Sequence, residues 1–203
     1  MLNVVLVTPE IASNTGNIGR TCVVTGSRLH LVGPLGFSLD DKMLKRAGLG
    51  YWHSLDLQVY NNWNEFVAKN DLVVDANEPR MHLLTKKARR LYTQAHYIDG
   101  DFLIFGCESI GLPETLLAAY PASCERIPML TDKTALSDAD EWHAAAGDTP
   151  AEQSALLQQD VCGNFVNPDD YRISALNLSN AAAIVIYEAL RQLDFPGMDV
   201  PEI

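Results

Sequence analysis

The segment Phe102-Leu-Ile-Phe-Gly-Cys-Glu-Ser-Ile-Gly-Leu-Pro113 decides the fold. Its four leading apolar residues predict a strand that ends at Gly106, and Pro113 is typical of the first turn of a helix. A strand, a glycine turn and a helix in this order form the repeating unit of α/β proteins.

The same alternation of strand and helix extends along the rest of the chain. Further strands are expected at residues 4–7, 28–32, 56–60 and 72–75, and residues 125–129 lead into one more. Helices are expected at residues 17–25, 40–47, 63–69, 113–119 and 178–193. This order predicts an α/β fold, a mostly parallel sheet with flanking helices, in a single domain over residues 1–203. Ligands of such sheets bind at the carboxyl ends of the strands.

Composition limits the classes of protein that remain. Hydrophobic residues make up 47% and charged residues 20% of the chain, as in an ordinary globular protein. The four cysteines form no CxxC pair, so we expect reduced thiols, no metal site and a cytoplasmic location. Residues 1–7 lack a basic lead-in and predict a strand, not a signal peptide, and no apolar run is long enough to span a membrane.

Negative charge is concentrated in one part of the sequence. The net charge of −11, taken alone, argues against nucleic-acid binding. Nine acidic residues and one lysine lie between residues 130 and 171, in a stretch rich in Ala, Asp and Gln. We interpret residues 130–171 as an acidic insertion, partly helical at residues 149–159, and the rest of the chain as nearly balanced in charge.

The first candidate site is Asn14-Thr-Gly-Asn-Ile-Gly-Arg20, at the start of the helix expected from residue 17. Glycines let backbone N–H groups approach a ligand, and a helix N-terminus favours an anion. Arg20 is expected on the first helical turn, where it can reach a phosphate or orient a hydroxyl. The alternative is a turn with asparagine caps and an exposed arginine.

Two further candidate sites follow later in the chain. After the predicted strand 102–105, Gly106 gives a flat ligand close access to the backbone, and Glu108 can accept a hydrogen bond or pair with Arg20. Polar side chains also open the last helix, at Asn177, Ser179 and Asn180. Ordinary turns and helix caps explain both segments equally well.

Two basic clusters are candidates for binding RNA phosphates: residues 42–46, which include Lys45 and Arg46, and residues 86–90. Tyr51 follows the first cluster, and an aromatic ring can stack on an unpaired base. A solvated charged face is the structural alternative. Motifs of zinc proteases, P-loop proteins, serine hydrolases and Rossmann proteins are absent from the sequence.

In this order, the three candidate sites resemble the three motifs of SPOUT-class RNA 2′-O-methyltransferases: N-x-G-N-x-x-R, F-G-x-E-x-x-G-L-P and I-P-M…S-L-N-L-S-N. The third motif is matched by Ile127-Pro-Met129 together with residues 176–180, with Ala175 where the class usually has serine. The TrmL/YibK branch, which modifies the wobble nucleotide of tRNA, is resembled further at residues 29–37, 45–52 and 187–192. The resemblance covers residues 1–129 and 172–198.

The resemblance implies a C-terminal trefoil knot, a homodimer whose sites draw on both chains, and S-adenosylmethionine as cofactor, without a metal. The implied reaction is 2′-O-methylation of the wobble cytidine or modified uridine, with leucine tRNAs as expected substrates and S-adenosylhomocysteine as product. The implied catalytic residues are Asn14, Arg20, Glu108 and Asn177. Since arginine is a poor base, Arg20 is expected to stabilise the developing alkoxide. The implied cofactor-binding residues are Ala76, Gly106, Gly111, Ile127, Met129, Ala175, Leu176 and Asn180, and the implied RNA-binding residues are Lys45, Arg46 and Tyr51.

The insertion at residues 130–171 separates the two halves of the third motif. We expect it to loop outward from the knot and, because its acidity repels RNA, to face away from the tRNA or to gate the site. Three alternatives stay open: a different tRNA position or rRNA as substrate, a catalytically silent RNA-binding protein, and a nucleotide-binding metabolic enzyme. The last would need an acidic ribose-binding residue after a Rossmann-type turn, and none is apparent in the sequence.

Overall fold

A computed structural model of the chain describes residues 1–39, 50–72, 80–129 and 175–199. In these ranges the strands form a six-stranded, entirely parallel sheet in the order β3-β2-β1-β5-β4-β6. The strands are β1 Asn3–Val7, β2 Arg28–Val32, β3 Leu57–Tyr60, β4 Met81–Leu84, β5 Phe102–Phe105 and β6 Cys124–Glu125. The predicted α/β class with a mostly parallel sheet is confirmed.

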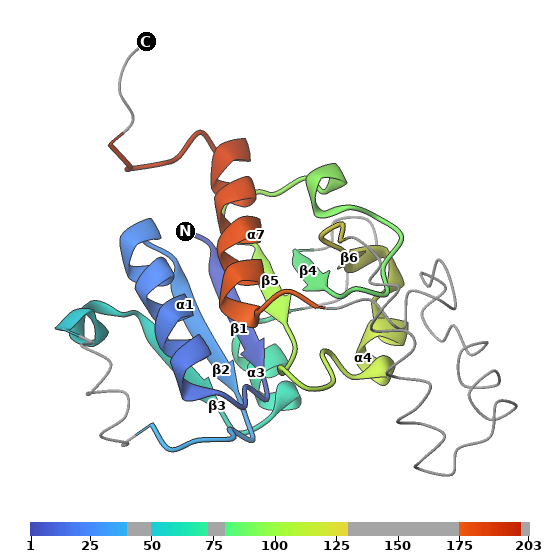
Figure 1. Ribbon diagram of the computed structural model, residues 1–203, viewed down its shortest axis with the longest axis horizontal. Helices are drawn as coiled ribbons and strands as arrows, with labels where there is room; N and C mark the ends of the chain where they lie inside the picture. The colour runs from blue at the N-terminus through green and yellow to red at the C-terminus, as the bar shows by residue number, and fades with distance from the viewer. Residues whose placement is uncertain (40–49, 73–79, 130–174, 200–203) are drawn as a thin grey trace, which may run out of the picture.

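Helices cover both faces of the sheet. On one face, α1 (Ala12–Thr25) and α7 (Leu178–Gln192) lie side by side, and on the other lie α3 (Trp63–Lys69) and α4 (Glu114–Ala119) (Figure 1). Successive residues of a strand point to opposite faces, so β1 contributes to both core layers. Val4 and Leu6 pack in the layer under α1 and α7, whereas Val5 and Val7 pack in the layer under α3 and α4.

Helix α1 begins at Ala12, so the predicted helix start at residue 17 is wrong. Asparagine is unfavourable inside helices because its side chain competes for nearby backbone groups. The side chain of Asn14 is instead hydrogen-bonded to Glu108 and Asn177, which leaves the helical backbone undisturbed. Arg20 therefore lies in the middle of the helix and not on its first turn.

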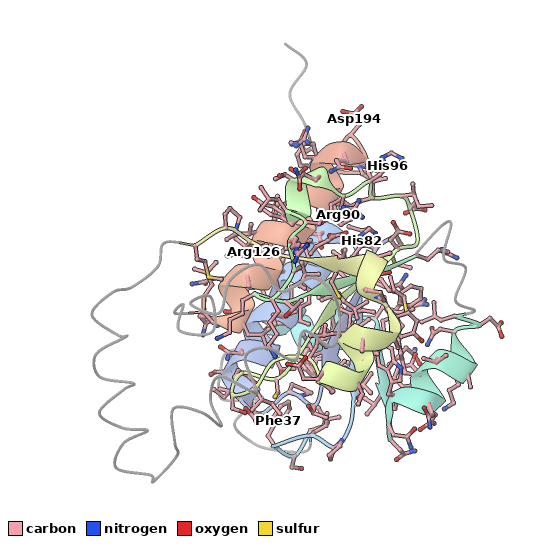
Figure 2. The ribbon with its side chains drawn as sticks, turned by 90° about the vertical axis from the view of Figure 1, so that its right-hand side faces the viewer. Phe37, His82, Arg90, His96, Arg126 and Asp194 are labelled. Atoms are coloured by element: carbon pink, nitrogen blue, oxygen red, sulfur yellow. The ribbon has the colours of Figure 1, made fainter. Side chains whose placement is uncertain are left out.

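Strand β4 is missing from the predicted strands because His82 interrupts its apolar pattern. His82 is nevertheless buried, with Nδ1 2.8 Å from Glu125 Oε1 and Nε2 3.1 Å from Asp101 Oδ2. Burial lowers the pKa of His82, but the hydrogen bonds to Asp101 and Glu125 outweigh it and raise the pKa to about 9. Arg90 lies close to His82 in Figure 2, with its Nη1 3.9 Å from Glu125 Oε1. The positive charges of His82 and Arg90 thus compensate the buried carboxylates of Asp101 and Glu125.

The other described elements agree with their predicted ranges to within a residue or two, except that residues 127–129 form no strand. Three short 3-10 turns, η1 Gly50–Ser54, η2 Tyr92–Gln94 and η3 Pro121–Ser123, were not expected. The helix predicted at 40–47, most of the strand predicted at 72–75 and the insertion at 130–171 lie outside the described residues, and Leu72 is not in a strand. The predicted trefoil knot would include residues outside the described ranges and stays a prediction.

Cys22, Cys107 and Cys124 are buried and form no disulfide within the described residues, in agreement with the expectation of reduced thiols, and Cys162 lies outside those residues. None of the helices in the described ranges is both long and apolar enough to cross a membrane. Among the same residues, no group of His, Cys, Asp or Glu is arranged to hold a metal ion.

Candidate cofactor and active site

A cavity of about 380 Å³ lies where the neighbouring strands β4 and β5 end. Five segments line it: the end of β4 and the residues after it, the turn after β5, the residues after β6, the N-terminal part of α1 and the start of α7. Its volume falls in the range of roughly 300–1,000 Å³ that is usual for small-molecule and cofactor sites. The carboxyl edge of the parallel sheet is also where the sequence predicts a ligand.

Most of the predicted site residues meet at this cavity. Its lining includes Asn14, Gly106, Glu108, Gly111, Ile127, Met129, Ala175, Leu176 and Asn177. The residues that line it do not include Arg20, Tyr51 or Asn180. Ala76, Lys45 and Arg46 lie outside the described residues, so their roles stay predictions.

A chain of hydrogen bonds joins three of the predicted residues at the cavity wall. Asn177 Nδ2 donates to Asn14 Oδ1 at 3.0 Å, and Asn14 Nδ2 donates to Glu108 Oε1 at 2.9 Å. Asn177 Oδ1 also accepts from the backbone N–H of Ser179 at 2.9 Å and caps α7. Because both ends of the Asn14 amide are engaged, its orientation is defined, and it ties α1 to the β5 turn and to α7.

Glu10 completes this network, although no motif in the sequence marks it. Its backbone N–H donates to Glu108 Oε2 at 2.9 Å. In return, the Glu10 carboxylate accepts from the backbone N–H and the hydroxyl of Ser109, at 3.0 and 2.7 Å. Leu84, the last residue of β4, and Thr85, which follows it, also line the cavity and were not selected, because β4 was not predicted.

The turn after β5 folds back on itself so closely that only glycine fits at its first position. A Cβ atom on Gly106 would lie 2.0 Å from the carbonyl carbon of Gly111 and 2.2 Å from the nitrogen of Leu112. Gly111 itself has a φ of 75°, in the left-handed region that favours glycine. These two glycines therefore shape the backbone that borders the cavity.

Arg20 lies on the exposed side of α1, together with Tyr51 of η1. The guanidinium carbon of Arg20 is 5.0 Å from the centre of the Tyr51 ring, a cation–π contact. The Tyr51 hydroxyl donates to the carbonyl of Gly16 at 2.6 Å. Burial raises the pKa of Tyr51, and Arg20 opposes that rise. One predicted catalytic residue and one predicted RNA-binding residue are thus brought together, but outside the cavity of their own chain.

Comparison with known proteins gives a consistent set of relatives. A tRNA (cytidine(34)-2′-O)-methyltransferase of Yersinia pestis is 37% identical over 199 residues, which are 97% of this chain and 97% of the relative. The enzyme of the same name from Escherichia coli K12 is 36% identical over 198 residues, with the same coverage.

Solved structures similar to this chain lead to the same group of relatives. A protein from Bacillus anthracis is 37% identical, with a TM-score of 0.71 over 98% of this chain and 99% of that one. A structure concerned with 2′-OH methylation of C/U34 on tRNA is 31% identical, with a TM-score of 0.67 over 96% and 97% of the two chains. The methyltransferase AviRb of Streptomyces viridochromogenes, solved with AdoMet, is 20% identical with a TM-score of 0.64 and shares the fold. Residues 1–136 match the SpoU rRNA Methylase family. The chain belongs to this family of methyltransferases.

Proposed function

We propose that this chain transfers the methyl group of S-adenosylmethionine to the 2′-hydroxyl of the wobble nucleotide of cytoplasmic tRNA. The target is a cytidine or a modified uridine, and leucine tRNAs are the expected substrates. The proposal is carried by the 36–37% identity, over nearly the whole chain, to enzymes that are named for this reaction at cytidine 34. The cavity supports it, because residues from each of the three sequence motifs line it.

The lining of the cavity suits S-adenosylmethionine. Leu84, Ile127 and Leu176 offer apolar surface to an adenine ring, and Gly106 brings backbone groups close to it. The Glu108 carboxylate favours a positively charged ligand by Coulomb attraction, and the sulfonium and ammonium groups of the cofactor carry such charge. When it is bound, the cofactor supplies the reactive methyl group, so the proposed reaction requires no metal.

The protein must then align the ribose hydroxyl and assist the loss of its proton. In our proposal Asn14, Asn177 and Glu108 hold the walls of the site in place through their shared hydrogen bonds. Arg20 stabilises the negative charge that develops on the ribose oxygen. A guanidinium suits this role because it stays protonated and donates hydrogen bonds in a fixed geometry.

In this proposal two copies of the chain share each site. Arg20 and Val24 lie on the exposed side of α1, and Asn180, Ile184 and Tyr187 lie on the exposed side of the adjacent α7. Val24 is 62% and Tyr187 44% exposed, which is apolar surface that a second copy would cover. Docking through this face brings Arg20 of one copy toward the cavity of the other. This arrangement accounts for an Arg20 that does not line its own cavity.

Transfer of labelled methyl groups from S-adenosylmethionine to bulk tRNA tests the proposal. The tRNA comes from a strain that lacks the corresponding activity, and mass spectrometry maps the modified nucleoside. We expect a 2′-O-methylpyrimidine at position 34 of leucine tRNAs. Transfer RNA from the parent strain, already modified, is the matched control and takes up no label.

Two outcomes contradict the proposal in different ways. Label in ribosomal RNA but not in tRNA favours a second candidate function, which the rRNA methylase description of the family supports. Absence of both S-adenosylmethionine binding and methyl transfer to any cellular RNA favours a catalytically silent RNA-binding protein.

A further inference from the structure

Lys86 occupies an unusual position at the cavity. It is the second residue after β4 and lines the cavity together with Leu84 and Thr85. Its side chain is about half-buried, and burial lowers the pKa of its ammonium group. Across the described ranges, its Nζ has neither a hydrogen bond nor an ion pair. The neighbouring Lys87 differs, because it pairs with Glu114.

Among the described residues, no charge around the cavity pairs with Lys86. Glu108 is the one carboxylate among the described residues that line the cavity, and its two oxygens already accept from Asn14 and from the backbone of Glu10. Strand β5 lies between β1 and β4, so Asn14 and Lys86 approach the cavity from opposite sides of the β5 turn. A partly desolvated lysine at a cavity whose described carboxylate is already hydrogen-bonded to other groups is suited to bind an anionic group of the ligand.

We propose that Lys86 binds the carboxylate of the amino-acid part of S-adenosylmethionine and of its product S-adenosylhomocysteine. This inference rests on the proposed function. That carboxylate is the single negative charge of the cofactor, and Lys86 is the cation at the cavity that lacks a partner among the described residues. An RNA phosphate is the less favoured anion, because Lys86 is half-buried among residues that enclose a small-molecule cavity.

Isothermal titration with two ligands tests the inference. S-adenosylhomocysteine carries the amino-acid part, whereas 5′-methylthioadenosine shares the adenosine and the sulfur but lacks the carboxylate. Replacing Lys86 by Met keeps an apolar stem and removes the charge. We expect Lys86→Met to raise the Kd of S-adenosylhomocysteine by about 10- to 100-fold and to leave the Kd of 5′-methylthioadenosine unchanged.

Two further variants serve as controls for this titration. Lys86→Arg retains the positive charge and should restore most of the affinity for S-adenosylhomocysteine. Lys69→Met, on α3, removes a surface lysine that pairs with Glu65 and should affect neither ligand.

The remaining outcomes overturn the inference. An equal loss of affinity for both ligands would show that Lys86 supports the shape of the cavity and not the carboxylate. Unchanged affinities with a raised KM for tRNA would assign Lys86 to an RNA phosphate. If the unmodified protein bound neither ligand, the proposed function itself would fail, so that result is distinguishable from the other two.

Discussion

Asn14 Nδ2 donates a 2.9 Å hydrogen bond to Glu108 Oε1 across 94 positions of sequence, and this bond joins α1 to the turn after β5. Both carboxylate oxygens of Glu108 accept hydrogen bonds, because the backbone N–H of Glu10 donates to Oε2. A glutamine at position 108 would turn an N–H group toward one of these donors. We expect Glu108→Gln to lower kcat/KM for methyl transfer by about tenfold or more.

Steady-state transfer of labelled methyl groups to tRNA measures the effect of Glu108→Gln. The matched control is Glu65→Gln, on the opposite layer of the protein, where Glu65 pairs with Lys69 near the surface. Equal activity of the two variants would show that the Asn14–Glu108 bond is not needed for the reaction.

Gly106→Ala should damage both stability and cofactor binding. The added Cβ would meet the backbone of Gly111 and Leu112 at 2.0–2.2 Å, and backbone cannot move aside as a flexible side chain can. We expect a loss of about 2 kcal/mol in the free energy of unfolding, together with weaker binding of S-adenosylmethionine. Urea unfolding and titration calorimetry measure the two effects. Gly50→Ala, where nothing lies within 4 Å of the added Cβ, should change neither.

Mixing two inactive variants tests whether Arg20 acts across a dimer. Arg20→Ala should abolish methyl transfer while S-adenosylmethionine still binds, because Arg20 does not line the cavity of its own chain. Refolding Arg20→Ala together with Glu108→Ala forms mixed dimers in which one of the two sites contains neither substitution. We expect partial recovery of activity, roughly a quarter of the unmodified rate under random mixing. No recovery from well-folded mixtures would place Arg20 and Glu108 in the same chain's site.

His82 makes folding stability depend on pH above neutrality. Its folded-state pKa of about 9 exceeds the ordinary value of 6.5, so the folded protein binds the proton more tightly. The stabilisation is complete below pH 6.5 and is lost as the pH rises through about 9, with a total of about 3 kcal/mol. Urea unfolding at pH 6.5 and pH 9.5 should show this loss. Burial raises the pKa of Tyr97, so that its hydroxyl stays protonated over this range.

A matched pair of variants assigns this pH dependence to His82. His82→Gln should lower stability at pH 6.5, because Asp101 and Glu125 lose a buried cation, and should flatten the change up to pH 9.5. His96→Gln, at the exposed position labelled in Figure 2, should keep the full change. A steep loss that persists in His82→Gln would assign the effect to another group.

Local signals explain which elements were predictable. The strand at 102–105 and the helix at 63–69 were predicted with their observed bounds, because apolar runs, glycine turns and Asn62 at the helix start act within a few residues. The start of α1 and strand β4 were not predicted, because the residues that stabilise them lie far away in the sequence. Asn14 needs Glu108 and Asn177 to be compatible with a helix, and His82 needs Asp101 and Glu125 to be buried in a strand.

By itself, the sequence determined the α/β class, the three motifs and most of the residues that line the cavity. Tertiary structure alone decided that Glu10, Leu84 and Lys86 belong to the same site and that Arg20 does not line the cavity. The reason is physical: periodicity and turn chemistry act between near neighbours, whereas the hydrogen bonds that assemble the site join residues 94 to 163 positions apart. Such contacts exist only once the parallel strands have brought their carboxyl ends to one edge.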